Sequence, residues 1–129
     1  MNGKNGFLYG IPFCARRVVK CNPLDKSLTE IGSDLGEDGC KWRYGVRAKN
    51  GNIYCATAYS EHTLKINTND GTVETLDIVE FPQTGTDLWL SGAFAADNNI
   101  YYMPYQARWI MRLNHDNDTC SSVVDDLGE

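Results

Sequence analysis

The chain has 129 residues, a formal net charge of −5 and 42% hydrophobic residues. This length is usual for one domain, and the apolar content is enough to build a core, which argues against a disordered chain. An acidic chain does not have the positively charged surface that binds nucleic acids or anionic membranes, so we expect neither as a partner. No apolar run approaches the roughly 18 residues of a membrane span.

In chain order, the first feature is a phrase that occurs three times, at 6–12, 51–57 and 98–104. With Tyr9, Tyr54 and Tyr101 as anchors, the copies are separated by 45 and 47 residues. An alternating segment follows each anchor in register, as VVKCN, TLKIN and IMRLN. A repeat of this length without gaps indicates a duplicated structural unit.

Each copy is predicted to form four short antiparallel strands. The first is a Trp-x-x-Gly segment that starts at Trp42 or Trp89, the second contains the Tyr anchor, and the third is the alternating segment. The fourth is short, around 28–31, 73–76 and 120–123, after turns rich in Asn, Asp and Gly, which tolerate left-handed backbone. The first copy lacks the Trp-x-x-Gly strand, and no segment keeps a helical period.

Four antiparallel strands in about 45 residues are typical of a propeller blade. The order Trp-x-x-Gly, Asn-Gly-x-Ile-Tyr, Leu-x-Ile-Asn and a short Val strand resembles blades of kelch-like, YVTN-like and lactonase-like propellers, without the Gly-Gly pair of true kelch repeats. The resemblance implies an all-β partial β-propeller, one domain over 1–129, with blades near 1–37, 38–83 and 84–129. It also implies that the first strand of each blade is innermost and lines a central channel.

The inner strands and their flanks are therefore the predicted binding surface, because arginine beside aromatic rings is typical of recognition sites. The candidate ligand- or partner-binding residues are Trp42, Arg43, Tyr44, Arg47, Asp87, Trp89 and Phe94. The alternative for the two tryptophans is packing between blades. The loop with Phe81 and Pro82 is a second candidate contact surface.

Two function classes remain open. The first is a binding or scaffold module for a protein or small-molecule ligand, with no catalytic residues, metal or cofactor. The alternative is a metal-dependent, lactonase-like hydrolase with six blades, of which this chain is a part. The predicted inner strands contain Arg43 and Arg47 and no carboxylate. Two arginines would oppose a bound cation, so we expect binding rather than catalysis.

The histidines and cysteines are assigned structural roles. His62 and His115 fall in predicted turns, where an exposed side chain is expected. Five cysteines without a C-x-x-C pair fit neither a disulfide framework nor a zinc site, which favours free thiols and a cytoplasmic location. Cys21 and Cys120 occupy apolar repeat positions and are predicted to pack in the core, whereas the reactivity of Cys40 stays open.

The predicted arc does not close on itself, since propeller rings need about four to eight blades. The segment 126–129 repeats 34–37 at the separation of two copies. An open arc leaves a blade face uncovered at each end. We therefore expect either a homo-oligomer or a part of a longer propeller.

Overall fold

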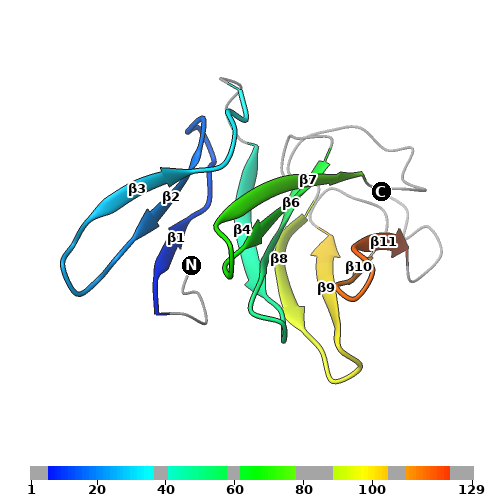
Figure 1. The fold of residues 1–129 in the computed structure, drawn as a ribbon. Coiled ribbons are helices and arrows are strands. Elements are labelled where there is room, and N and C mark those ends of the chain that lie inside the picture. Colours follow the sequence, from blue (N-terminus) through cyan, green and yellow to red (C-terminus); the bar gives the residue numbers. More distant parts are fainter. Residues whose placement is uncertain (1–5, 37–40, 58–61, 78–88, 105–109, 123–129) are drawn as a thin grey trace.

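The computed structural model describes residues 6–36, 41–57, 62–77, 89–104 and 110–122. These residues form three antiparallel sheets and no helix, which confirms the all-β expectation (Figure 1). Among them, no helix has the length and apolar character needed to cross a membrane. The sheets follow one another in chain order and are called blades 1, 2 and 3 below.

Within the described ranges, blade 1 has three strands and no inner strand, as the sequence predicts. It consists of β1 (Leu8–Gly10), β2 (Val18–Cys21) and β3 (Leu28–Ile31). Blade 2 contains β4 (Trp42–Arg47), β5 (Ile53–Thr57), β6 (His62–Asn67) and β7 (Thr72–Asp77). Blade 3 contains β8 (Trp89–Phe94), β9 (Asn99–Pro104), β10 (Met111–Asn114) and β11 (Thr119–Ser122).

The repeat register of the sequence is also the pairing register of the strands. Each anchor tyrosine lies opposite the basic residue of the next strand, as Tyr9–Lys20, Tyr54–Lys65 and Tyr101–Arg112. Side chains alternate between the two faces of a strand, so these pairs all lie on the same face of their blades. We call this face, which in blades 1 and 2 packs on the following blade, the outgoing face, and the opposite one the incoming face.

Two turn positions recur with left-handed backbone in every blade. The turns before β1, β5 and β9 contain Gly6, Gly51 and Asn98, and the turns before β3, β7 and β11 contain Lys26, Gly71 and Asp118. In the second set, an Asn at the end of the preceding strand or directly after it accepts a hydrogen bond from the amide two residues further along the chain, for example from Leu24 N to Asn22 Oδ1 at 3.0 Å. Such Asx turns explain why Asn recurs at this position.

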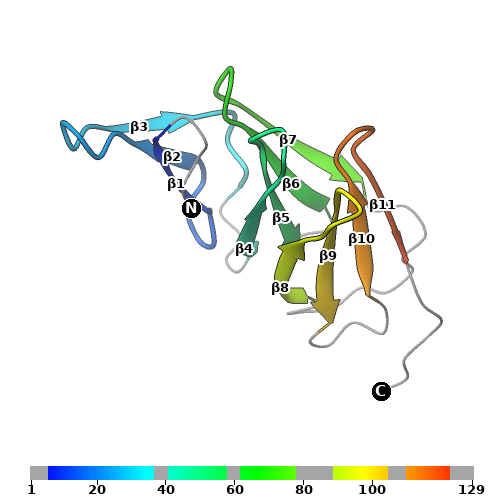
Figure 2. The same cartoon turned by 90° about the horizontal axis from the view of Figure 1, so that it is seen from below.

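The core lies in the two contacts between blades. Seam 1 joins the outgoing face of blade 1 to the incoming face of blade 2, and seam 2 joins blades 2 and 3 in the same way (Figure 2). Seam 1 buries Tyr9, Val18, Trp42, Ile53, Cys55, Leu64 and Ile66. Seam 2 buries Val46, Ala48, Tyr54, Ala56, Trp89, Ile100, Tyr102, Met111, Leu113 and Cys120.

The Trp and the Gly of the Trp-x-x-Gly motif both contribute to the packing of these seams. Trp42 and Trp89 are each 2% exposed and pack on the preceding blade. A Cβ at Gly92 would lie 2.5 Å from Cδ1 of Tyr102, and one at Gly45 would lie 3.0 Å from Cγ2 of Ile53. The glycine is therefore needed because a buried side chain of the neighbouring strand occupies the space of a Cβ.

Candidate functional site

The inner strand β4 brings three of the predicted site residues to the surface. Arg43 and Arg47 are exposed, and Tyr44 is 48% exposed. The pairing of β4 with β5 shifts by one residue between Trp42 and Tyr44, which makes a β-bulge at Arg43. Bulges re-aim side chains, and here the guanidinium of Arg43 lies 4.8 Å from the ring centre of Phe13, in the segment between β1 and β2.

Phe13 is held beside β4 by the backbone. The amide of Lys41 donates a hydrogen bond to the carbonyl oxygen of Phe13 at 2.9 Å, and the Lys41 ammonium donates to the carbonyl of Gly36 at 3.0 Å. Lys41, directly before β4, is thus fixed to blade 1. A cation over an aromatic face is a favourable contact, so Phe13 orients Arg43 while leaving it exposed.

The structure places both tryptophans of the candidate set in the core. The indole Nε1 of Trp42 donates a hydrogen bond of 2.7 Å to the carbonyl oxygen of His62, so its polar edge is also satisfied internally. Trp89 is buried in seam 2. These residues have the packing role given as the alternative, and they present no surface to a ligand.

Phe94 and Asp87 complete the predicted set. Phe94 ends the inner strand β8, is 36% exposed, and its ring centre lies 5.8 Å from that of His115. Strands β4 and β8 are in contact, so Phe94 lies on the strand next to β4. Asp87 lies outside the described residues, as do Cys40, Phe81 and Pro82.

The expectation for the histidines is wrong. His115 does lie in a turn, but its side chain is only 6% exposed because it packs beside Phe94. Neither ring nitrogen of His115 has a hydrogen-bond partner among the described residues, and the exposed carboxylate of Asp116 is 3.7 Å from Nδ1. His62 begins β6 rather than lying in a turn, and is partly buried.

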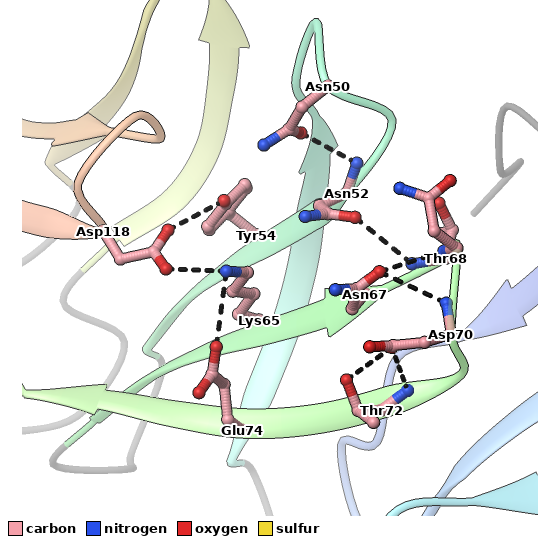
Figure 3. A network of polar contacts seen from close by, with 11 residues as sticks. Asn50, Asn52, Tyr54, Lys65, Asn67, Thr68, Asp70, Thr72, Glu74 and Asp118 are labelled. Carbon is pink, nitrogen blue, oxygen red and sulfur yellow. Dashed lines mark hydrogen bonds and ion pairs between the residues drawn. The ribbon is translucent and has the colours of Figure 1, made fainter.

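A charged network crosses seam 2 and was not predicted. The hydroxyl of Tyr54 donates to Oδ1 of Asp118 at 2.9 Å, and the Lys65 ammonium donates to Oδ2 at 2.6 Å (Figure 3). Glu74 lies 3.3 Å from the same ammonium. Asp118 belongs to the turn before β11, so a carboxylate of blade 3 pairs with a cation of blade 2.

The environment of this network shifts the pKa values of its members. Burial raises the pKa of Tyr54, and the negative charge of Asp118 adds to that shift. Burial is the largest single influence on Lys65 and lowers its pKa, but the hydrogen bonds to Asp118 and Glu74 and the charges of Tyr54 and Asp118 together outweigh it, so the lysine pKa is raised. The sequence does show one member of such a network, the basic residue that recurs as Lys20, Lys65 and Arg112. The sequence does not show which residue of the next blade pairs with it.

Several of the described carboxylates accept hydrogen bonds from nearby residues in turns. Asp70 accepts from the amide and the hydroxyl of Thr72, and Asp97 accepts from the amide of Asn99 and the hydroxyl of Tyr101. These bonds lower the pKa of Asp70 and of Asp97, in each case chiefly through the side-chain hydroxyl. Within the described ranges, no three His, Cys, Asp or Glu residues lie close enough together to hold a metal ion.

No family model matches the chain, and no curated protein matches it either. Solved structures do. Virginiamycin B lyase from Staphylococcus aureus superposes with a TM-score of 0.75 at 13% identity, over 95% of this chain and 39% of that one. A streptogramin B lyase gives 0.72 at 17% identity, over 94% of this chain and 38% of the other.

The extracellular domain of a putative hybrid two-component system, BT4673 from B. thetaiotaomicron, gives a TM-score of 0.75 at 12% identity, over all of this chain and 16% of that one. These likenesses show the fold, an all-β part of a β-propeller. The chain spans about 39% of the length of the first lyase. At such identities they do not carry an activity over to this chain.

Proposed function

We propose that the chain is part of a propeller-type binding module, and that its inner strand β4 binds an anionic group of a small-molecule or protein ligand. The observation that carries the proposal is the exposure of Arg43, Tyr44 and Arg47 on one inner strand. The chain as a whole has a net charge of −5, whereas the six residues of β4 include two arginines and no acidic residue.

The chemistry of these side chains fits carboxylate or phosphate recognition. A guanidinium group offers parallel N–H donors that match the two oxygens of a carboxylate. Tyr44 and Phe94 add aromatic surface of the kind that supports ligand contact. Phe13 orients Arg43 before a ligand arrives, which reduces the entropy lost on binding.

Binding without catalysis is our preferred function. Strands β4 and β8 contain no Asp, Glu or His, so a catalytic acid, base or metal ligand would have to come from another segment. The similar solved structures include lyases and a sensor domain, one of the lyases in complex with quinupristin, and a shared fold does not choose between these roles. Unpaired thiols at Cys14, Cys21, Cys55 and Cys120 support our proposal of a cytoplasmic location.

The binding proposal is tested with matched pairs of probes. Benzoate and a hexaglutamate peptide are compared with benzamide and hexaglutamine by ¹H–¹⁵N correlation spectroscopy. We expect only the carboxylates to shift the amides of β4. Replacing both arginines, as Arg43→Gln with Arg47→Gln, should weaken binding by at least about tenfold, since hydrogen bonds to charged groups contribute roughly 1.5–3 kcal/mol.

The control is Lys49→Gln, which removes an exposed charge from the turn after β4. Equal binding of the amides, or an equal loss in the Lys49 variant, would contradict the proposal. A separate assay with divalent metals and a panel of lactones tests the catalytic alternative. Metal-dependent turnover that Asp87→Asn abolishes would show that the module is an enzyme.

A further inference from the structure

The two seams stabilise the recurring basic residue in different ways. In seam 2, Lys65 of blade 2 binds Asp118, which occupies the left-handed position in the turn before β11 of blade 3. In seam 1 the corresponding turn residue of blade 2 is Gly71, which has no carboxylate. There the ammonium of Lys20 lies 4.1 Å from the ring centre of Phe7, in its own blade.

The residue at the Phe7 position distinguishes the two arrangements. Blade 2 has Asn52 at this repeat position, which supplies no ring for Lys65, and Asn52 instead accepts a hydrogen bond from the amide of Thr68 at 3.3 Å. A blade with an aromatic residue here satisfies its cation internally by a cation–π contact. In blade 2, which has Asn52 here, the ammonium of Lys65 lies 6.0 Å from the ring centre of Tyr54 and takes a carboxylate, that of Asp118, from the blade that follows.

Blade 3 belongs to the second type. Its basic residue is Arg112, and Asn99 occupies the Phe7 position. Arg112 makes no ion pair or ring contact within the part of the chain that the structure describes, and it is only partly exposed. A partly buried guanidinium without an anion loses solvation without gaining a charged partner.

The acidic group beside Arg112 on this outgoing face is already engaged. Asp97 accepts hydrogen bonds from the hydroxyl of Tyr101, from the amide of Asn99 at 3.0 Å and from its side-chain amide at 3.2 Å. In seam 2 the corresponding residues are Asn50 and Tyr54, and Tyr54 directs its hydroxyl to Asp118. Among the described residues of blade 3, no acidic group is therefore left on this face to pair with Arg112.

We propose that the outgoing face of blade 3 binds a further propeller blade with an acidic residue at the left-handed position of the turn before its last strand. The contact would repeat seam 2, with Arg112 in the role of Lys65 and the incoming acid in the role of Asp118. Met103, which is 45% exposed, and the partly buried Ile110 supply the apolar part of this face. This partner surface is separate from the ligand site proposed on β4.

A second copy of the chain does not meet this requirement. Its blade 1 does present an apolar incoming face, with Leu8 42% and Leu28 71% exposed. The residue at its left-handed turn position is Lys26, which would face Arg112 with a like charge. Of the two expectations from the sequence, a longer propeller is therefore favoured over self-association at this face.

The inference is tested by changing the charge at position 26 of the full chain. Lys26→Asp places a carboxylate where blade 3 has Asp118, and Asp tolerates the left-handed backbone there, as Asp118 does with φ 56°. We expect sedimentation velocity to show self-association at least about tenfold tighter than that of the unchanged chain, weakening at high salt. Lys26→Asn only removes the positive charge, so its self-association should be tighter than that of the unchanged chain and weaker than that of Lys26→Asp.

Arg112 provides the matched test. The double variant Lys26→Asp with Arg112→Glu should lose the gained association, whereas Arg112→Glu alone should associate more tightly than the unchanged chain, because its Glu faces Lys26. If the glutamate variant unfolds, Arg112→Gln takes its place. Combined with Lys26→Asp, it should likewise abolish the tighter self-association. The proposal is overturned if Lys26→Asp associates no better than the unchanged chain, or if Arg112 substitutions leave its association intact.

Discussion

Seam 1 and seam 2 join equivalent faces of the same repeat, yet they differ at the rim. Seam 1 is almost wholly apolar around Trp42, and its lysine lies over an aromatic ring of its own blade. Seam 2 has the same kind of apolar centre around Trp89 but adds Tyr54, Lys65 and Asp118 across the boundary. The comparison shows that the repeat conserves the apolar centre of a seam, while single turn residues determine the charge at its edge.

The largest expected effect comes from removing the centre of either seam. Trp42→Ala and Trp89→Ala should each lower the free energy of unfolding by about 3–5 kcal/mol, because each leaves a cavity between two blades. Urea denaturation followed by far-UV circular dichroism measures this. If one seam were only loosely packed, its Trp→Ala variant would lose less than about 1 kcal/mol of unfolding free energy. The centres of the two seams would then not be equivalent.

A second effect, on the order of 2 kcal/mol, should appear at alkaline pH. Burial raises the pKa of the Cys120 thiol in seam 2 from 9.0 to about 11, an effect only partly offset by its hydrogen bond to Thr63. The folded state keeps this proton longer than the unfolded chain does, so the contribution is present below pH 9 and is lost as the pH rises through 11.

Urea midpoints of the unchanged chain and of Cys120→Ala, compared at pH 8 and pH 11, measure this difference. The alanine variant should lose less stability over the interval. The thiol of Cys55 in seam 1 is also buried and has a raised pKa, so Cys55→Ala is the matched variant for the other seam. Identical losses in the unchanged chain and in Cys120→Ala would show that the thiol does not cause the pH dependence.

A smaller effect should follow from breaking the charged rim of seam 2. Asp118→Asn keeps a side chain suited to the left-handed backbone but removes the anion from Lys65 and Tyr54. Because Lys65 is only 14% exposed, we expect a loss of about 1–2 kcal/mol in thermal or urea unfolding. Glu74→Gln, at the exposed side of the same lysine, should cost less than about 0.5 kcal/mol.

The smallest effect is expected at the rim of seam 1. Lys20→Met removes the cation over Phe7 but keeps the aliphatic stem, so it should cost only about 0.5–1 kcal/mol. The loss of stability caused by Lys20→Met should not change with salt, whereas the loss caused by Asp118→Asn should become smaller as salt screens the Lys65–Asp118 pair. A loss larger than that of Asp118→Asn would reverse the comparison between the two rims.

Much of the fold could be predicted because the repeat positions report burial directly. Leu64 and Ile66 alternate in β6, Leu113 takes the position of Ile66 in β10, and all three are buried as the period of a strand requires. The missing inner strand of blade 1 was also visible. The turns followed from Asn and Gly at positions that need Asx turns or left-handed backbone.

The candidate site was harder to predict because it depends on a bulge and on contacts between blades. Simple alternation would place Trp42 and Tyr44 on the same face of β4, but the bulge at Arg43 separates them, so that Trp42 is buried and Tyr44 is 48% exposed. His115 has the sequence context of an exposed turn, yet Phe94 covers it. Asp118 pairs with Lys65, 53 residues away, and no local pattern encodes such a distance.

The position of blade 2 between two seams has a consequence for backbone dynamics. Its strands β5 and β6 are hydrogen-bonded on both edges and covered on both faces, by Tyr9 and Val18 on one side and by Ile100 and Leu113 on the other. Opening their amides to solvent requires both seams to separate, while β3 and β11 lie at sheet edges and open by local fraying. Amide hydrogen exchange should therefore be slowest in the middle of the arc and fastest at its ends, so that blade 2 acts as the foldon on which the other two blades depend.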